Sequence, residues 1–334
     1  MSGRRVLRFS HPPAVLCWAS VVGKKEGEGP LAGSFDVVNP DTTFGEKTWE
    51  KAESRMQQIA LQTALNKGGL HSGEIDCLFA GDLLNQCIGS GFAHRDSGIP
   101  FLGLYGACST MAEGLLCAAA AVDGGYAGRA AVTVSSHFCS AERQYRFPLA
   151  YGGQRTPTAQ WTVTGAGCAV LGAGGGRRGV HITAACPGRI VDLGVTDVNN
   201  MGGAMAPAAF DTLWTFFEQT GTAPADYDLI VTGDLAQVGA DVLRRLFADR
   251  GVDLAPVYHD CGLMIFDRDK QDVHAGGSGC GCSAAVLCGE ILRQMEQGQR
   301  QKVIFAGTGA LLSPTSMQQG ESIPGICHLV LLEG

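Results

Sequence analysis

The chain repeats part of its own sequence, and this internal repeat constrains the fold more than any single motif does. The segment DCLFAGDLLNQ, residues 76–86, resembles DLIVTGDLAQ, residues 228–237. Each segment is an apolar run that ends in Gly-Asp-Leu, and the comparison places Asp82 at the position of Asp234. Self-similarity over this distance indicates that one structural unit occurs twice.

A second pair of similar segments, 106–136 and 278–309, extends the repeat, because each reads as a loop, a helix, a turn and a buried strand. Alternating helices and short apolar strands predict an α/β fold of two similar halves with central, mostly parallel sheets. We place the boundary in GAGGGRRG, 172–179, which gives halves 1–178 and 179–334. Because a strand-like segment follows this run, we interpret it as a hairpin turn and not as a nucleotide-binding loop.

Composition and charge exclude several classes of protein. The net charge is -7 and no basic block occurs, so the sequence predicts no nucleic-acid partner. The longest apolar run, near Leu115 to Val122, is too short to span a membrane, and no signal peptide is evident, so we expect synthesis in the cytoplasm. The 13 cysteines are an odd number scattered through apolar segments, which is typical of reduced, buried thiols.

Four polar side chains follow predicted strands, at positions where α/β folds place ligands. They are Asp82, Cys108, His137 and Asp234. A duplicated architecture brings such strand ends toward one central cleft. Cys108 also lies at the start of a predicted helix rich in small residues, so it is either a nucleophile or a residue that has lost that role.

With these features the chain resembles the thiolase superfamily, whose duplicated αβαβα layered fold places a reactive cysteine at the N-terminus of a buried helix. Cys108 matches that cysteine, and a helix N-terminus favours a thiolate. Condensing enzymes of the superfamily carry a histidine where this chain has TGDLAQ, 232–237, and an asparagine or second histidine where it has GGSGCGCSA, 276–284. The resemblance therefore implies a protein without condensing activity, because nothing evident stabilises the oxyanion of a Claisen step.

Within this superfamily the chain resembles the stage V sporulation protein AD family of spore-forming bacteria. The resemblance is carried, in order, by GPLAGSFD (29–36), WEKAE (49–53), AGDLLNQ (80–86), YGACST (105–110), SSHFCSAERQYRFP (135–148), TDVNNMGGAMAPAA (196–209), YHDCGLMIFD (258–267), GGSGCGCSA and TGALLSP (308–314). It implies binding of dipicolinic acid (pyridine-2,6-dicarboxylate), uptake into the developing spore and release in germination. It also implies integral membrane partners from the same operon and a peripheral location at the inner membrane of the forespore and spore.

The implied ligand is a flat aromatic dianion, so its pocket needs hydrogen-bond donors and cations. We expect His137 and Arg143 to meet its carboxylates, and Ser109 with nearby backbone N–H groups to donate further bonds. Asn85 and Gln86 supply neutral donors beside Asp82.

Asp82 and Asp234 have two alternative roles. They share a calcium ion with the ligand, because carboxylate oxygens suit that cation, or they accept hydrogen bonds from loop N–H groups and fix the cleft. No resident cofactor or metal is predicted. A zinc site at His259, Cys261, Cys280 and Cys282 is disfavoured, because the Cys-x-Cys spacing is unlike that of common zinc sites.

Two other functions remain open from the sequence. The chain could be an acyltransferase or thioesterase that uses Cys108 as an acyl carrier and His137 as base, or a scaffold with a vestigial cleft. Thiolase relatives commonly dimerise, so a homodimer is one further expectation.

Overall fold

The computed structural model of the protein describes residues 3–145, 155–174 and 179–334. Two series of strands and helices follow one another in the same order, which confirms the internal repeat. The first series is β2 (Ala14–Val22), α1 (Trp49–Gly68), β4 (Cys77–Gly81), α2 (Ile88–His94), β5 (Phe101–Leu104), α3 (Thr110–Asp123), β6 (Arg129–Ser136) and β8 (Gly165–Gly172). The second is β9 (His181–Cys186), α6 (Met201–Thr220), β10 (Leu229–Thr232), α7 (Ala236–Ala248), β11 (Tyr258–Asp260), α9 (Cys280–Val286), β13 (Lys302–Ala310) and β14 (Gly325–Glu333).

Further elements lie between or beside the members of these two series. They are β1 (Leu7–Arg8), β3 (Val37–Val38), α4 (Phe138–Tyr145), β7 (Trp161–Thr162), α8 (Cys261–Met264), β12 (Gly277–Ser278), the π-helical turn Leu287–Ile291, α10 (Leu292–Glu296) and α11 (Pro314–Gln318).

The strands of the two series form the halves of one long sheet. The order β5-β4-β6-β8-β2 of the first half continues as β9-β14-β13-β10-β11 in the second, and Ala14 of β2 lies opposite His181 of β9 where they join. Among these ten strands, only β8 in the first half and β14 in the second run against the others of their half. The predicted class, two similar halves with mostly parallel sheets, is therefore confirmed.

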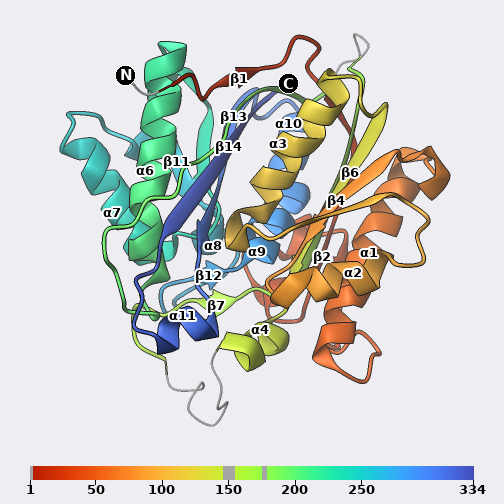
Figure 1. Ribbon diagram of the computed structural model, residues 1–334, viewed down its shortest axis with the longest axis horizontal. Coiled ribbons are helices and arrows are strands. Elements are labelled where there is room, and N and C mark those ends of the chain that lie inside the picture. Colours follow the sequence, from red (N-terminus) through yellow and green to blue (C-terminus); the bar gives the residue numbers. More distant parts are fainter. Residues whose placement is uncertain (1–2, 146–154, 175–178) are drawn as a thin grey trace.

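The two half-sheets are separated by a central pair of helices, α3 and α9 (Figure 1), and α3 contacts strands of both halves. On the outer faces, α1 covers the first half-sheet, and α6 and α7 cover the second. Three buried apolar cores fill the spaces between these layers. Representative members are Met111, Leu115, Val132 and Val231 in the central core, Met56, Leu65 and Leu78 in the first outer core, and Leu213, Phe216 and Ile304 in the second.

Glycines allow the central helix α9 to lie directly on strand β8. A Cβ atom at Gly167 would lie 2.4 Å from the carbonyl oxygen of Ala284, and one at Gly281 would lie 2.3 Å from that of Gly165. Backbone contact this close excludes any larger residue at these two positions.

The long outer helices α1 and α6 begin and end in similar ways. Thr48 caps α1 by accepting a bond from the N–H of Lys51, and Asn200 caps α6 by accepting one from Gly203. Each helix has 20 residues and stops at a left-handed glycine, Gly69 at φ 63° and Gly221 at φ 71°.

The interpretation of 172–179 as a hairpin turn is wrong. Residues 175–178 lie outside the described residues, but β8 and β9, which this segment connects, are not neighbours in the sheet. Strand β2 lies between them, because it pairs with β8 over nearly its whole length. The segment is thus a crossover between the two halves; the exact boundary at 178 stays a prediction.

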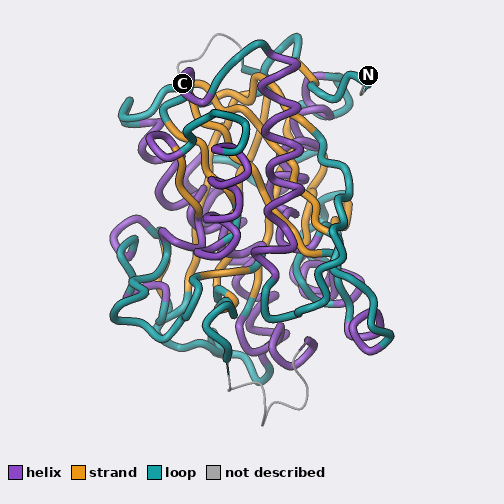
Figure 2. The backbone as a smooth tube through the Cα atoms, turned by 90° about the vertical axis from the view of Figure 1, so that its left-hand side faces the viewer, coloured by secondary structure: helices purple, strands orange, loops and turns teal. Residues whose placement is uncertain are grey.

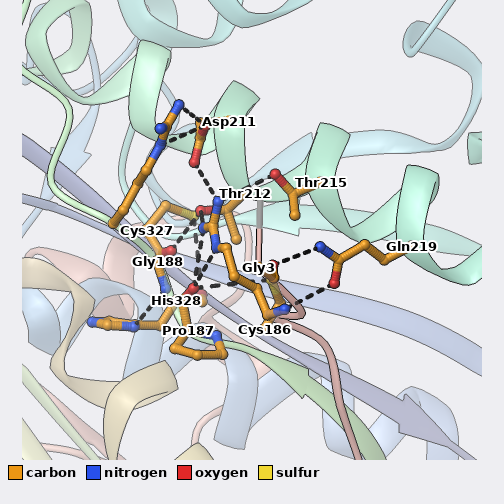
Figure 3. A network of polar contacts seen from close by, with 12 residues as sticks. Gly3, Cys186, Pro187, Gly188, Asp211, Thr212, Thr215, Gln219, Cys327 and His328 are labelled. Atoms are coloured by element: carbon orange, nitrogen blue, oxygen red, sulfur yellow. Dashed lines mark hydrogen bonds and ion pairs between the residues drawn. The ribbon is translucent and has the colours of Figure 1, made fainter. Parts of the chain in front are cut away.

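Arg5 fixes the N-terminal segment to the second half by hydrogen bonds to residues around Asp211, whose polar contacts Figure 3 shows. Its guanidinium donates to Asp211 at 2.7 Å, to Thr215 at 3.2 Å and to the carbonyl of Pro187 at 3.0 Å. This anchor holds β1 against β9, with which it pairs antiparallel.

Candidate functional site

A cavity opens at the end of the molecule where α4, α11, β7 and β12 gather, opposite the end that holds both termini (Figures 1 and 2). Its volume of about 110 Å³ is several times what one water needs. The lining is largely apolar and comes from both halves: Leu83, Ala107, Cys108, Ala141, Glu142, Tyr145, Thr162, Val198, Asn199, Met201, Ser278, Gly279, Ala310, Leu312 and Met317.

Cys108 reaches this cavity from a tight turn that precedes α3. Ala107 adopts the left-handed conformation with φ 52°, which is unusual for a residue with a Cβ. Two hydroxyls close the turn: Ser109 Oγ donates to the carbonyl of Gly106 and Thr110 Oγ1 to that of Ala107, both at 2.6 Å. Ser109 is fully buried and serves the turn, so the structure does not place it in the cavity.

Asp234 lies directly behind Cys108, close enough for the two side chains to interact electrostatically. The carboxylate also accepts from the N–H of Gly279 at 2.8 Å and from Thr308 Oγ1 at 2.9 Å. Burial raises the pKa of Asp234 to about 6. Burial, followed by the charge of Asp234, raises the pKa of Cys108 well above its ordinary value, so the thiol stays protonated at neutral pH.

Asp82 occupies the matching position in the first half, but its hydrogen bonds go to residues that follow it in the chain, in the loop after β4 and at the start of α2. Its carboxylate accepts from the N–H of Leu84 at 2.8 Å and from the N–H and Oγ of Ser90 at 2.7 and 2.6 Å. The side chain is fully buried and does not line the cavity. Of the two predicted roles, these bonds match the second, in which the carboxylate fixes a loop.

Asn85 and Gln86 are exposed on the loop that Asp82 holds, and neither lines the cavity. Asn85 accepts a bond from the hydroxyl of Tyr105 at 3.2 Å. Gln86 adopts a left-handed conformation with φ 60°.

His137 is buried, and both of its ring nitrogens have backbone partners. Nε2 lies 2.7 Å from the carbonyl oxygen of Thr42, and Nδ1 accepts from the N–H of Cys139 at 3.1 Å. These partners assign a neutral ring with its proton on Nε2, and burial lowers its pKa. The ring therefore holds the start of α4 and does not face the cavity.

Arg143 is exposed on α4 and forms an ion pair with Glu50. Its guanidinium also lies over the ring of Trp49, 5.4 Å from the ring centre. The structure does not bring it to the cavity.

Of the eight predicted ligand residues, Cys108 alone lines the cavity, with Asp234 behind it. The ligand roles of the others stay predictions. The polar lining groups are residues that the sequence did not single out: Glu142, Tyr145, Thr162, Asn199 and Ser278. Ser278 lies in the segment 276–284 that the family resemblance includes, but no pattern indicated that Thr162 or Asn199 would line the same cavity.

The cavity wall carries a buried ion pair. Arg155 donates to Glu142 at 3.0 Å, and the side chains are only 4% and 7% exposed. The guanidinium of Arg155 lies over the rings of Phe138 and Trp161, at 4.9 and 4.6 Å from their centres. Among the described lining residues, Glu142 is the one charged group and none is Lys, Arg or His.

The four side chains considered for zinc are not grouped as metal ligands. His259 is exposed, whereas Cys261, Cys280 and Cys282 are fully buried. In the described part of the chain, no three His, Cys, Asp or Glu side chains are arranged to hold a metal ion. Nor does any helix in the same part have the length and apolarity needed to cross a membrane.

Comparison with known proteins identifies the family. The family model described as stage V sporulation protein AD (SpoVAD) matches residues 3–333. Stage V sporulation protein AD of Bacillus subtilis (strain 168) is 44% identical over 333 residues, which is 100% of this chain and 98% of that protein.

Solved structures with the same fold are much more distant in sequence. A variant of OleA from Xanthomonas campestris superposes with a TM-score of 0.61 at 13% identity, over 98% of this chain and 100% of that one. The 3-oxoacyl-(acyl carrier protein) synthase III, FabH, of Xanthomonas oryzae pv. oryzae KACC10331 gives 0.60 at 13% identity, with the same coverage. At this identity the likeness shows a thiolase-like fold and not an activity.

Proposed function

Since the chain belongs to the stage V sporulation protein AD family, a family of sporulation proteins, we propose that it binds dipicolinic acid in the cavity beside Cys108 without chemical conversion. In this role it supports uptake of dipicolinate into the developing spore and its release in germination. The ligand's ring lies against the apolar wall, and Thr162, Asn199 and Ser278 supply neutral hydrogen-bond donors.

The contact between Cys108 and Asp234 is the observation that supports binding over catalysis. A cysteine nucleophile reacts as its thiolate, which cations and helix N-termini favour. A buried carboxylate opposes this ionisation, and His137 is not available as a base because its ring is bonded to Thr42 and Cys139. The segments 232–237 and 276–284 contain no histidine or asparagine to replace it.

Calcium accompanies the ligand in this proposal. Dipicolinate is a dianion, whereas the charge of Glu142 in the cavity lining is already balanced by Arg155, and the carboxylate of Asp234 lies behind Cys108. Bringing a dianion to this wall is unfavourable unless a cation compensates its charge, and calcium is a cation that carboxylate oxygens ligate well.

Asp82 and His137 act indirectly in this proposal, by holding segments around the cavity. Asp82 fixes the loop that follows β4, and His137 fixes the start of α4. Leu83, which follows Asp82, lines the cavity. Ala141 and Glu142 of α4 line it as well.

Calorimetric titration with dipicolinate, with and without calcium, tests the proposal. The competing function, an acyltransferase or thioesterase with Cys108 as acyl carrier, requires a covalent adduct. Incubation with acyl-CoA of several chain lengths, followed by intact mass measurement, distinguishes the two. An adduct that maps to Cys108 supports the enzyme, whereas saturable dipicolinate binding without an adduct supports the binding protein.

We also propose that integral membrane proteins of the same operon hold this chain at the inner membrane of the forespore and spore. Fractionation of spores that contain those partners tests the location.

A homodimer would use the free edge strand β5, where Phe101 and Leu102 are 41% and 46% exposed. Light scattering measures that assembly, and Leu102→Lys should weaken it by placing charge on the edge.

A further inference from the structure

Glu53 of α1 is a buried acid that contacts the helix forming one wall of the cavity. Its side chain is 1% exposed. One carboxyl oxygen, Oε1, lies 3.1 Å from Ser135 Oγ of β6, and the other, Oε2, lies 2.6 Å from Ser140 Oγ of α4. The residues after Ser140, which are Ala141 and Glu142, line the cavity.

The hydroxyl of Ser140 has two acceptors within reach. Besides Glu53, the carbonyl oxygen of His137 lies 3.0 Å from Ser140 Oγ. The same carbonyl accepts the first helical bond of α4, from the N–H of Ala141 at 3.0 Å. A hydroxyl carries a single proton, so Ser140 donates to one of these acceptors at a time.

The protonation state of Glu53 determines which acceptor Ser140 uses. When Glu53 is neutral, its own O–H donates to Ser140 Oγ, and Ser140 donates to His137 inside the first turn of α4. When Glu53 is ionised it cannot donate, so Ser140 turns its proton toward the carboxylate and its bond to His137 is lost. Release of one proton thus removes one hydrogen bond from the cavity wall.

The surroundings of Glu53 favour the neutral form. Burial, followed by the charge of Asp82, raises its pKa to about 8. The titratable groups that interact with Glu53 electrostatically are Asp82 after β4, Glu50 on α1 and Cys280 of α9. Glu50 is paired with Arg143 of α4. His94 of α2 is connected to Glu53 through Gln57 and Ser135, and His137 precedes α4. None of these groups donates a hydrogen bond to the Glu53 carboxylate.

We propose that Glu53 and Ser140 form a proton-operated contact that tightens or loosens the α4 wall of the cavity. Neither Glu53 nor Ser140 lines the cavity, so the contact would act on it through α4. This proposal rests on the proposed function only for the identity of the ligand. The contact makes access to the cavity depend on pH, because protonation of Glu53, and not of the ligand, changes the α4 wall.

Hydrogen exchange of the intact protein tests this contact without any ligand. The measured quantity is the protection factor of the α4 peptide, corrected for the intrinsic exchange rate, at pH 7 and pH 9, on either side of the pKa of about 8. In the unmodified protein we expect protection to fall several-fold, up to about tenfold, as one hydrogen bond is lost. In Glu53→Gln it should stay constant, because the glutamine amide donates to Ser140 as the neutral acid does.

Two further variants complete the test. Asp260→Asn is the control, since Asp260 is also a buried acid but bonds to Thr232, Leu235 and Ala236, away from α4; it should behave like the unmodified protein. Ser140→Ala removes the shared hydroxyl and should abolish the pH response of α4 even if Glu53→Gln does not fold. The proposal would be overturned if protection in the unmodified protein did not change between pH 7 and pH 9. It would also be overturned if Glu53→Gln or Ser140→Ala lost as much protection over this range as the unmodified protein does. Failure to bind dipicolinate would leave this result standing and count against the proposed function alone.

Discussion

The thiol of Cys108 interacts with the carboxylate of Asp234, and this contact joins the two halves of the duplicated fold. Cys108 comes from the turn before α3 in the first half, and Asp234 from the loop after β10 in the second. Burial, together with the charge of Asp234, keeps the sulfur protonated at the cavity wall.

Removing the charge of Asp234 should make Cys108 more reactive. In Asp234→Asn the carboxylate no longer opposes ionisation, so the pKa of the thiol falls, and each unit of decrease gives roughly tenfold more thiolate. We expect Cys108 to be alkylated at least several-fold faster by iodoacetamide at pH 8, as measured by peptide mass spectrometry. Asp260→Asn removes another buried acid from the same half and should change the rate far less; an equal or slower rate in Asp234→Asn would show that the carboxylate does not control the thiol.

Loss of the Asp82 carboxylate should destabilise the protein. Asp82→Ala leaves the N–H groups of Leu84 and Ser90 without their acceptor in a buried loop. The free energy of unfolding should fall by about 2–4 kcal/mol, which denaturant titration measures. Asp82→Asn keeps one acceptor and should cost less. If Asp82→Ala were as stable as the unmodified protein, the loop would not depend on this carboxylate.

Stability should decrease as pH rises from about 5 to 8. Burial is the first cause that raises the pKa of Glu26 to about 7, of Asp260 to about 7 and of Glu53 to about 8. In this range the unfolded chain ionises these acids while the folded protein keeps them protonated, so unfolding releases protons and is favoured by higher pH. Below the ordinary pKa values, and above the raised ones, the two states carry equal charge on these groups and their contribution no longer changes with pH.

Glu26→Gln isolates one part of this pH dependence. Glutamine keeps an acceptor for the N–H of Thr164 but does not titrate. Between pH 5 and 7 the slope of unfolding free energy against pH should become shallower by up to about 1.4 kcal/mol per unit. An unchanged slope in chemical denaturation at several pH values would contradict the assignment of a neutral Glu26.

The fold was predictable because both halves carry similar short patterns of apolar and small residues. The two apolar runs that end in Gly-Asp-Leu form strands β4 and β10. The small-residue segment after Cys108 forms helix α3, which ends at Asp123, before Gly124 and Gly125. The crossover after β8 was not predictable, because a glycine-rich run shows where a strand ends but not which strand lies beside it.

The candidate site was less predictable than the fold. Sequence position showed that Cys108 and Asp234 follow strands, but the direction of a side chain depends on its partners. His137 turns to the carbonyl of Thr42 and Asp82 to N–H groups that follow it in the chain. Asn199 reaches the cavity from a connection between elements, where no periodic pattern marks it.

Calorimetric titration of dipicolinate, with and without calcium, into the unmodified protein, Cys108→Ser and Cys108→Trp tests the central claim most directly. Serine preserves the small polar shape, whereas tryptophan fills a cavity of about 110 Å³. With far-ultraviolet dichroism confirming that all three proteins fold, the account predicts saturable binding to the unmodified protein and to Cys108→Ser, and its loss in Cys108→Trp. Absence of binding to the unmodified protein under both conditions, or equal binding to Cys108→Trp, would contradict it.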